Sequence, residues 1–240
     1  MSRGSTSAVC VDCGLPDTGA TFRGLLGRLG YGGETTVPRD VYAQSRGALD
    51  TALAAARPRV VYRILEVDSV TGREIIAGRF VVDSRRWARV AAEASPPMYL
   101  AVACATLGPG LDETIALARA ESLGRGYMMD AAGTGILESV ADAWTKTLGR
   151  EPGLEGLSLS RRFSPGYCDW PLESQKQFAE CLPMDKVGVA CTRAWAMVPA
   201  KTVTAAVLAA ESLTRDCPCA FCPESFCDHR RANREANLNP

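Results

Sequence analysis

Apolar residues recur every three or four positions along several stretches of the chain, which is the spacing of one face of an α-helix. A stripe of this kind predicts a helix over residues 39–56, which ends before Pro58. The same spacing predicts shorter helices over residues 84–94, 111–123 and 173–181. The longest stripe predicts a helix over residues 127–148 and consists of Ile136, Leu137, Val140, Ala141, Trp144 and Leu148.

Between these helices the pattern changes to short runs of β-branched and apolar residues, which are typical of strands. Residues 60–67 and 74–82 are expected to pair with each other as a hairpin around Gly72. Further strands are predicted over residues 99–106, 187–192 and 202–208. Because strand pairs and helices alternate irregularly, the order favours an α+β fold with a mixed or antiparallel sheet and flanking helices.

Composition divides the chain into three parts. Residues 1–37 are rich in Gly, Ser and Thr and are expected to form a flexible N-terminal arm. Residues 38–212 hold the predicted helices and strands and form the α+β domain, and residues 213–240 form a Cys-rich tail. Within the domain, Gly133 and Gly135 interrupt the long helix at a cost of about 1 kcal/mol each, so another backbone or a ligand is expected to approach there.

Charge and composition exclude several classes of function. The 27 basic residues balance 27 acidic ones, so the chain lacks the charge excess of a non-specific nucleic-acid binder. No apolar run reaches the roughly 20 residues of a membrane span, and the first residues lack the apolar core of a signal peptide. A cytoplasmic protein is therefore expected, in which the ten cysteines are reduced thiols or metal ligands.

The single histidine, His229, narrows the possible chemistry. Nucleophilic catalysis of the Ser-His-Asp or Cys-His type needs a histidine base, and one residue in a polar tail is a poor candidate. Metal sites with three histidines are excluded.

One ten-residue segment, Arg-Phe-Ser-Pro-Gly-Tyr-Cys-Asp-Trp-Pro at 162–171, combines a cation, a proline-glycine turn and two aromatic rings. Proline and glycine fix a non-repetitive backbone there. A guanidinium grips carboxylates and an aromatic face attracts cations, so the segment suits a small ligand that carries both kinds of group. The chemistry of the segment alone leaves an ordinary packed turn as an equal alternative.

The wider pattern resembles the activation domain of cobalamin-dependent methionine synthase, and in particular the stand-alone proteins built from it. The resemblance rests on Arg162-x-x-x-Gly166-Tyr167 and on the Leu-Pro-Met-Asp-Lys-Val-Gly-Val stretch at 182–189. It also includes Leu-Gly-x-x-Leu-Asp at 107–112 and the helix around Glu138, and it covers roughly residues 40–210. That family binds S-adenosylmethionine and remethylates cob(II)alamin after an electron donor has reduced it.

The resemblance implies roles for particular residues. Arg162 would bind the methionine carboxylate of S-adenosylmethionine, with Arg161 as its solvent-facing neighbour. Pro165, Gly166 and Tyr167 would shape the pocket, with Tyr167 facing the corrin as the catalytic residue. Glu138 would contact the ligand's amino group or ribose, and a solvated acid on the helix surface remains its alternative.

The chain departs from the family pattern directly after Tyr167. The full-length enzyme has Ala-Cys-Pro after its Gly-Tyr-Pro and then an acidic-His pair, where this sequence has Cys-Asp-Trp-Pro-Leu-Glu at 168–173. The missing histidine removes any contact that it makes to the corrin. Trp170 could offer a flat apolar surface instead or fill the core, and Cys168 could be a buried apolar residue or a reactive thiol.

The tail contains a second candidate site. Four cysteines within eleven residues, Cys217, Cys219, Cys222 and Cys227, indicate metal ligation in a reducing compartment. Zinc would make the tail a structural knot, and an iron–sulfur cluster would supply an electron. The spacing fits neither common pattern, so the metal stays open, as do unligated thiols. Cys10 and Cys13 could add ligands.

These residues predict a reactivation protein that binds S-adenosylmethionine and remethylates the cobalamin carried by a methionine synthase or a related corrinoid protein. A chain of 240 residues is too short for cobalamin and homocysteine modules as well, so a partner and an electron donor such as flavodoxin or ferredoxin are expected. Two alternatives remain open: a non-catalytic S-adenosylmethionine-binding adaptor, and an electron-transfer protein that uses a Cys-ligated cluster.

Overall fold

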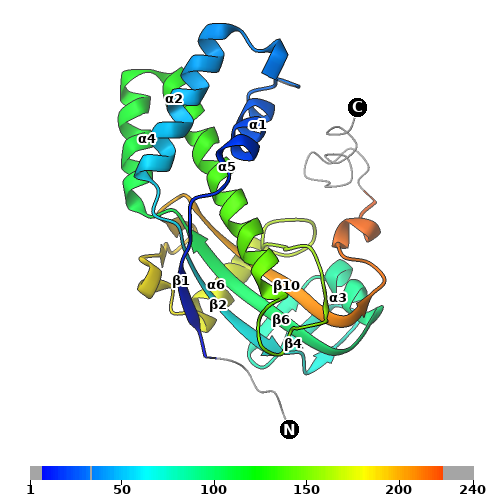
Figure 1. The fold of residues 1–240 in the computed structure, drawn as a ribbon. Helices are drawn as coiled ribbons and strands as arrows, with labels where there is room; N and C mark the ends of the chain where they lie inside the picture. Colours follow the sequence, from blue (N-terminus) through cyan, green and yellow to red (C-terminus); the bar gives the residue numbers. More distant parts are fainter. Residues whose placement is uncertain (1–6, 33, 224–240) are drawn as a thin grey trace.

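A five-stranded antiparallel sheet, in the order β1-β2-β6-β10-β7, runs through the centre of the computed structural model, which describes residues 7–32 and 34–223 (Figure 1). The longest pairing joins β6 to β10, from Thr106 opposite Thr202 to Ala94 opposite Leu213. The strands of this sheet are β1 (Val9–Asp12), β2 (Arg59–Glu66), β6 (Ala94–Thr106), β7 (Ser158–Leu159) and β10 (Thr202–Leu213).

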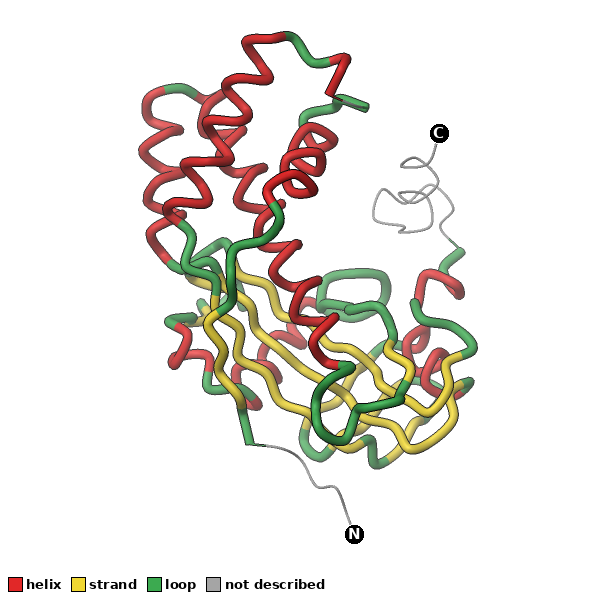
Figure 2. Tube along the Cα trace, viewed as in Figure 1, coloured by secondary structure: helices red, strands yellow, loops and turns green. Residues whose placement is uncertain are grey.

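Four helices pack on one face of the sheet. They form one apolar core with the side chains of alternate residues of β2, namely Val60, Tyr62 and Ile64. Figure 2 shows the longest of them running from the helical part of the molecule down across the strands. The helices are α1 (Thr18–Arg28), α2 (Arg39–Ala55), α4 (Pro109–Glu121) and α5 (Leu123–Leu148).

The opposite face of the sheet carries smaller elements around a second core, which includes Val61 and Leu65 of β2. Two small sheets and two helices lie there. They are β3 (Ser69–Val70), β4 (Glu74–Ala77), β5 (Phe80–Asp83), α3 (Arg85–Ala92), α6 (Gln175–Cys181), β8 (Ala190–Cys191) and β9 (Met197–Val198). Single-turn 3₁₀ helices at Glu34–Thr36, Leu172–Ser174, Met184–Val187 and Pro218–Phe221 complete the described elements.

The predicted α+β class is confirmed, with an antiparallel central sheet and helices on its faces. Each of the predicted helices has a counterpart whose ends lie within a few residues of those expected. The strand expected at 202–208 continues to Leu213, whereas the one expected at 187–192 is reduced to Ala190–Cys191 because a 3₁₀ helix occupies Met184–Val187.

The predicted hairpin between residues 60–67 and 74–82 is wrong. β2 pairs with β1 on one side and β6 on the other, so it has no free edge for the following residues. Residues 74–82 instead fold on themselves, because Gly78 has a φ of +61° and turns the chain so that Ala77 pairs with Phe80.

The expected flexible arm also differs from the structure. Within residues 7–32, β1 joins the sheet and α1 packs on α5. Asp17 caps α1, since its Oδ1 accepts the Gly19 N–H at 2.8 Å. Phe22, Leu25 and Leu26 are at most 1% exposed, so this helix is part of the first core.

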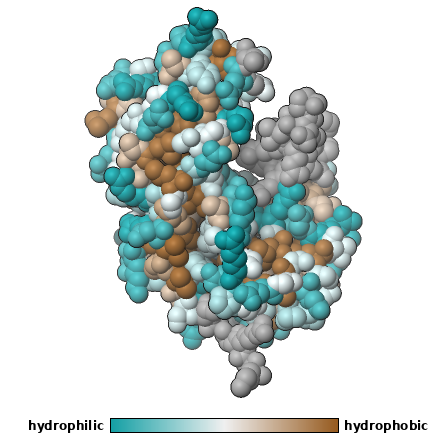
Figure 3. Space-filling model, in the orientation of Figure 1, coloured by the Kyte–Doolittle hydropathy of each residue, from teal (hydrophilic) through white to brown (hydrophobic). Residues whose placement is uncertain are grey.

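The surface leaves some apolar side chains exposed. Figure 3 shows them between hydrophilic ones on the face in view, and the exposed large apolar residues include Val9, Val11 and Leu15, on β1 and just after it. Among the residues that the structure describes, no helix combines the length and the apolar character that crossing a membrane requires.

Candidate functional site

After β7 the chain continues to pair with β10 as far as the start of the predicted ligand loop, residues 162–167. The Phe163 N–H donates to the Ala206 carbonyl at 2.9 Å, and the Ala206 N–H donates to the Phe163 carbonyl at 2.8 Å. Because side chains alternate along an extended chain, Phe163 enters the second core while Arg162 reaches the helix α5 on the other face. This pairing with β10 is what orients Arg162.

Arg162 is buried, at 6% exposure, and contacts two carboxylates of α5. Its Nε donates to Asp142 Oδ1 at 2.7 Å, and its Nη2 donates to Glu138 Oε2. Burial alone would lower the pKa of Arg162, but the two carboxylates outweigh it and hold this pKa above its ordinary value. Arg162 is therefore a fixed cation.

The two acids belong to a polar stripe that runs along α5. Asp130, Thr134, Glu138 and Asp142 follow one another at intervals of four, which places them on one side of the helix. Lys201 ends the stripe, because its Nζ lies 2.9 Å from Thr134 Oγ1 and 3.0 Å from Asp130 Oδ2. The stripe thus pairs with Arg162 at one end and with Lys201 at the other.

The nearest groups to the two helix glycines are side chains of other elements of this chain, and not the close backbone or ligand that the sequence predicted. A Cβ built on Gly133 would lie 3.2 Å from Cε of Lys201, and one built on Gly135 would lie 3.6 Å from Cγ2 of Thr21 in α1. At Gly135 this is an ordinary van der Waals distance, so α1 packs against α5 there without crowding. This packing brings the C-terminal end of α1 towards Arg162.

A cavity of about 270 Å³ lies where α1, α5 and the 162–167 segment meet. The structure brings three of the predicted ligand-binding residues together in its wall, Glu138, Arg162 and Tyr167. Tyr167 is 43% exposed, and its ring lies beside the ring of Phe163. Polar side chains that the sequence analysis did not single out also line the cavity: Arg28, Thr134 and Ser164.

Pro165 and Gly166 do not line the cavity; they form the turn that carries Tyr167. Gly166 has a φ of +89°, and its N–H donates to the Trp170 carbonyl at 2.8 Å. A side chain at this position would strain the turn, which accounts for the glycine. The ligand-binding roles of these residues stay predictions.

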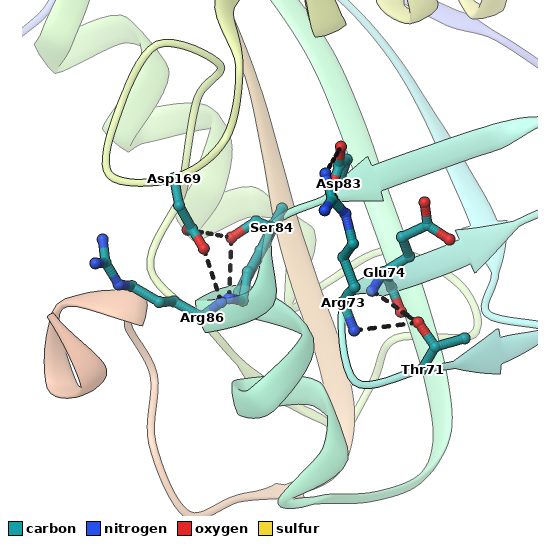
Figure 4. A network of polar contacts seen from close by, with 8 residues as sticks. Thr71, Arg73, Glu74, Asp83, Ser84, Arg86 and Asp169 are labelled. Carbon is teal, nitrogen blue, oxygen red and sulfur yellow. Dashed lines mark hydrogen bonds and ion pairs between the residues drawn. The ribbon is translucent and has the colours of Figure 1, made fainter.

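The Cys-Asp-Trp half of the loop fixes the turn to α3 (Figure 4). Asp169 accepts the Ser84 hydroxyl at 2.6 Å and the Arg86 backbone N–H at 3.2 Å, so it satisfies groups at the start of that helix. Trp170 is 2% exposed and packs on Trp87, with ring centroids 5.3 Å apart. Trp170 therefore fills the core.

Cys168 lies on the surface of the same turn. The residue has a φ of +57°, and its sulfur accepts a hydrogen bond from Arg86 Nη1 at 2.9 Å. Of the two alternatives for this thiol, the buried apolar residue is excluded.

Two tail cysteines, Cys217 and Cys219, line the same cavity as Arg162. No group of three or more Cys, His, Asp or Glu side chains within residues 7–32 and 34–223 is arranged to hold a metal ion. Cys227 lies outside the described residues. The four-cysteine metal site therefore stays a prediction, and Cys217 and Cys219 form part of the cavity wall.

Sequence reasoning missed Asp142 and Arg28 for different reasons. Asp142 follows Glu138 by four residues, so the spacing along the helix could have identified it as a partner for the same cation. Arg28 comes from the segment expected to be a flexible arm, and only the packing of α1 on α5 brings it to the cavity.

Comparison with known proteins supports the fold. No protein-family model and no curated protein matches the sequence. Among solved structures, the chain is similar to the MetH reactivation domain bound to AdoHcy, with a TM-score of 0.61 over 86% of this chain and 79% of that chain. The two sequences are 14% identical, so this likeness shows the fold.

Proposed function

We propose that this chain binds S-adenosylmethionine in the cavity beside Arg162 and uses it to remethylate the cobalamin of a partner corrinoid protein, such as a methionine synthase. One observation carries the proposal: Glu138, Arg162 and Tyr167, which a sequence resemblance selects, line one cavity. The fold is that of a reactivation domain whose structure contains AdoHcy.

The charges around the cavity suit this ligand. Arg162 faces two carboxylates, those of Glu138 and Asp142, so this group of three carries one net negative charge. The ammonium and sulfonium of S-adenosylmethionine are both cationic and would be attracted to it. Glu138 contacts Arg162 through Oε2 and its side chain is 38% exposed, which leaves Oε1 to accept a hydrogen bond from the ammonium.

The cavity, at about 270 Å³, is slightly smaller than the roughly 300–1,000 Å³ of most small-molecule sites. It would hold the amino-acid end of the ligand, and the adenosine would extend beyond it. Tyr167, partly exposed in the cavity wall, would then lie beside the sulfonium and contact the corrin of the partner.

The reaction needs no acid or base from this chain. An electron donor such as flavodoxin or ferredoxin would reduce the partner's cob(II)alamin, and the resulting cobalt nucleophile would attack the methyl group. The carbon–sulfur bond would break, leaving S-adenosylhomocysteine. The chain would contribute by holding the methyl group close to the cobalt, which is catalysis through proximity and orientation.

Calorimetry on the full chain tests the binding step. We expect one saturable site for S-adenosylmethionine and for S-adenosylhomocysteine. Glu138→Gln should weaken the binding of S-adenosylmethionine about tenfold or more, since a hydrogen bond to a charged group contributes about 1.5–3 kcal/mol. Glu113→Gln, an exposed acid on α4, is the matched control and should bind normally. No binding to the unmodified chain would contradict the proposal.

A second measurement tests the chemistry. The chain is mixed with a cob(II)alamin-loaded corrinoid protein, a low-potential reductant and methyl-labelled S-adenosylmethionine, and the label on cobalamin is counted. Label transfer supports reactivation. Binding without transfer would favour the adaptor alternative.

A further inference from the structure

The cavity wall includes a second arginine, which the resemblance does not select. Arg28 is the last residue of α1 and lines the cavity together with Glu138 and Arg162. Its side chain is half-buried. A cation at this position changes which residue can bind the acidic end of a ligand.

Arg162 is already paired with two carboxylates of this chain. Its Nε and Nη2 both donate to acids of α5, and the side chain is 5% exposed. A ligand carboxylate bound to Arg162 would come close to Glu138 and Asp142, and like charges repel at such distances. Arg162 thus fixes the two acids in place and is a poor receptor for a third.

Arg28 is in the opposite situation. It forms an ion pair with no residue of the described ranges, and its contact through Nη1 is a long one of 3.5 Å to the Gly24 carbonyl. A guanidinium is well matched to a carboxylate because it can donate two parallel hydrogen bonds. Arg28 therefore has donors to offer to a ligand.

The packing of α1 fixes the position of Arg28. Phe22, Leu25 and Leu26 anchor the helix in the first core. The Thr21 hydroxyl lies 3.3 Å from the Ser139 hydroxyl of α5. The helix is fixed against α5 along its length, so its last residue has a defined place at the cavity.

We propose that Arg28 binds the carboxylate of the ligand's amino-acid group, while Glu138 binds the ammonium. This assignment rests on the proposed function and deepens it, because it selects zwitterionic S-adenosyl ligands over analogues without a carboxylate. Arg162 is then a positioning residue that holds Glu138.

The test compares two ligands, S-adenosylmethionine and its decarboxylated analogue, by calorimetry on the full chain. Arg28→Ala should weaken binding of S-adenosylmethionine at least tenfold and change that of the decarboxylated analogue less than twofold. Arg28→Lys should lose less, because it keeps the charge. Arg23→Ala, an exposed arginine on the same helix, is the control and should bind both ligands normally.

The outcomes separate this assignment from the proposed function. Equal losses for both ligands in Arg28→Ala, or no loss for either, would overturn the assignment while the proposed function stands. If the unmodified chain binds neither ligand, the proposed function fails and the assignment fails with it. A loss confined to the carboxylate-bearing ligand supports both.

Discussion

Adjacent arginines at 161 and 162 have very different surroundings. Arg162 is buried between Asp142 and Glu138, whereas Arg161 forms a pair with Asp216 in which both side chains are partly exposed, at 30% and 54%. Extended backbone sends the two side chains to opposite faces. The sequence resemblance assigned the important role to Arg162 and a solvent-facing one to Arg161, and the structure agrees on which of the two reaches the cavity.

This difference predicts unequal effects on stability. Removal of one partner from a buried ion pair costs about 3–5 kcal/mol of stability, and the exposure of the two acids reduces this cost. Arg162→Ala should therefore lower the free energy of unfolding by about 1–3 kcal/mol. Arg161→Ala should lower the free energy of unfolding by less than about 1 kcal/mol. Urea unfolding of both variants measures the difference. Equal losses would show that the buried network does not stabilise the fold.

At the scale of elements, two glycines of α5 differ in how closely another helix approaches them. A Cβ on Gly126 would lie 2.6 Å from the Arg119 Cα in α4, whereas one on Gly135 would meet Thr21 at an ordinary 3.6 Å. The first glycine is required by a backbone, and the second is not. The sequence does not distinguish the two glycines, because both occur inside one helix; they differ in the space around them.

Alanine substitutions test this reading. Gly126→Ala should lower the free energy of unfolding by about 1–3 kcal/mol, because the α4 backbone must move. Gly135→Ala should be neutral or raise it by up to about 1 kcal/mol, since alanine favours the helix. Thermal unfolding of the two variants gives the comparison. A stable Gly126→Ala would mean that the two helices separate easily.

The sequence predicted elements whose signal is local and missed arrangements that depend on distant partners. Helices such as α2 and α5 follow from their own apolar stripes. The pairing of β2 did not, because its two neighbours are β1 and β6, and β6 begins 28 residues after β2 ends. The same limit applies to the site: the loop residues carried a recognisable motif, whereas Arg28 reaches the cavity only through the packing of α1.

For the molecule as a whole, the sheet separates two cores, and the cavity lies at one border between them. Arg162 and Glu138 approach it from the side of the helices, while Phe163 and the turn of Tyr167 connect it to the second core. The described start of the Cys-rich tail, residues 213–223, adds to the cavity wall, because Cys217 and Cys219 line the same cavity. This part of the tail and the candidate ligand site therefore adjoin each other.

Besides the ion pair of Asp216 with Arg161, an aromatic contact holds residues 213–223 in place. Two guanidinium groups lie over the Phe221 ring, with the Cζ atoms of Arg89 and Arg215 at 4.2 and 5.6 Å from its centroid. Exposed cation–π contacts contribute about 0.5–1 kcal/mol each. Phe221→Ala should thus let the tail open roughly 5- to 30-fold more often, and Cys219 should react with iodoacetamide faster by that factor.

Peptide mass spectrometry of the labelled chain measures this rate. Phe221→Trp preserves a ring for both cations and should label slowly, as the unmodified chain does. Cys104, which is 0% exposed in β6, reports the intact fold and should stay unlabelled in every variant. An unchanged rate at Cys219 in Phe221→Ala would mean that other contacts hold the tail. A faster rate together with weaker S-adenosylmethionine binding would show that the docked tail completes the cavity wall.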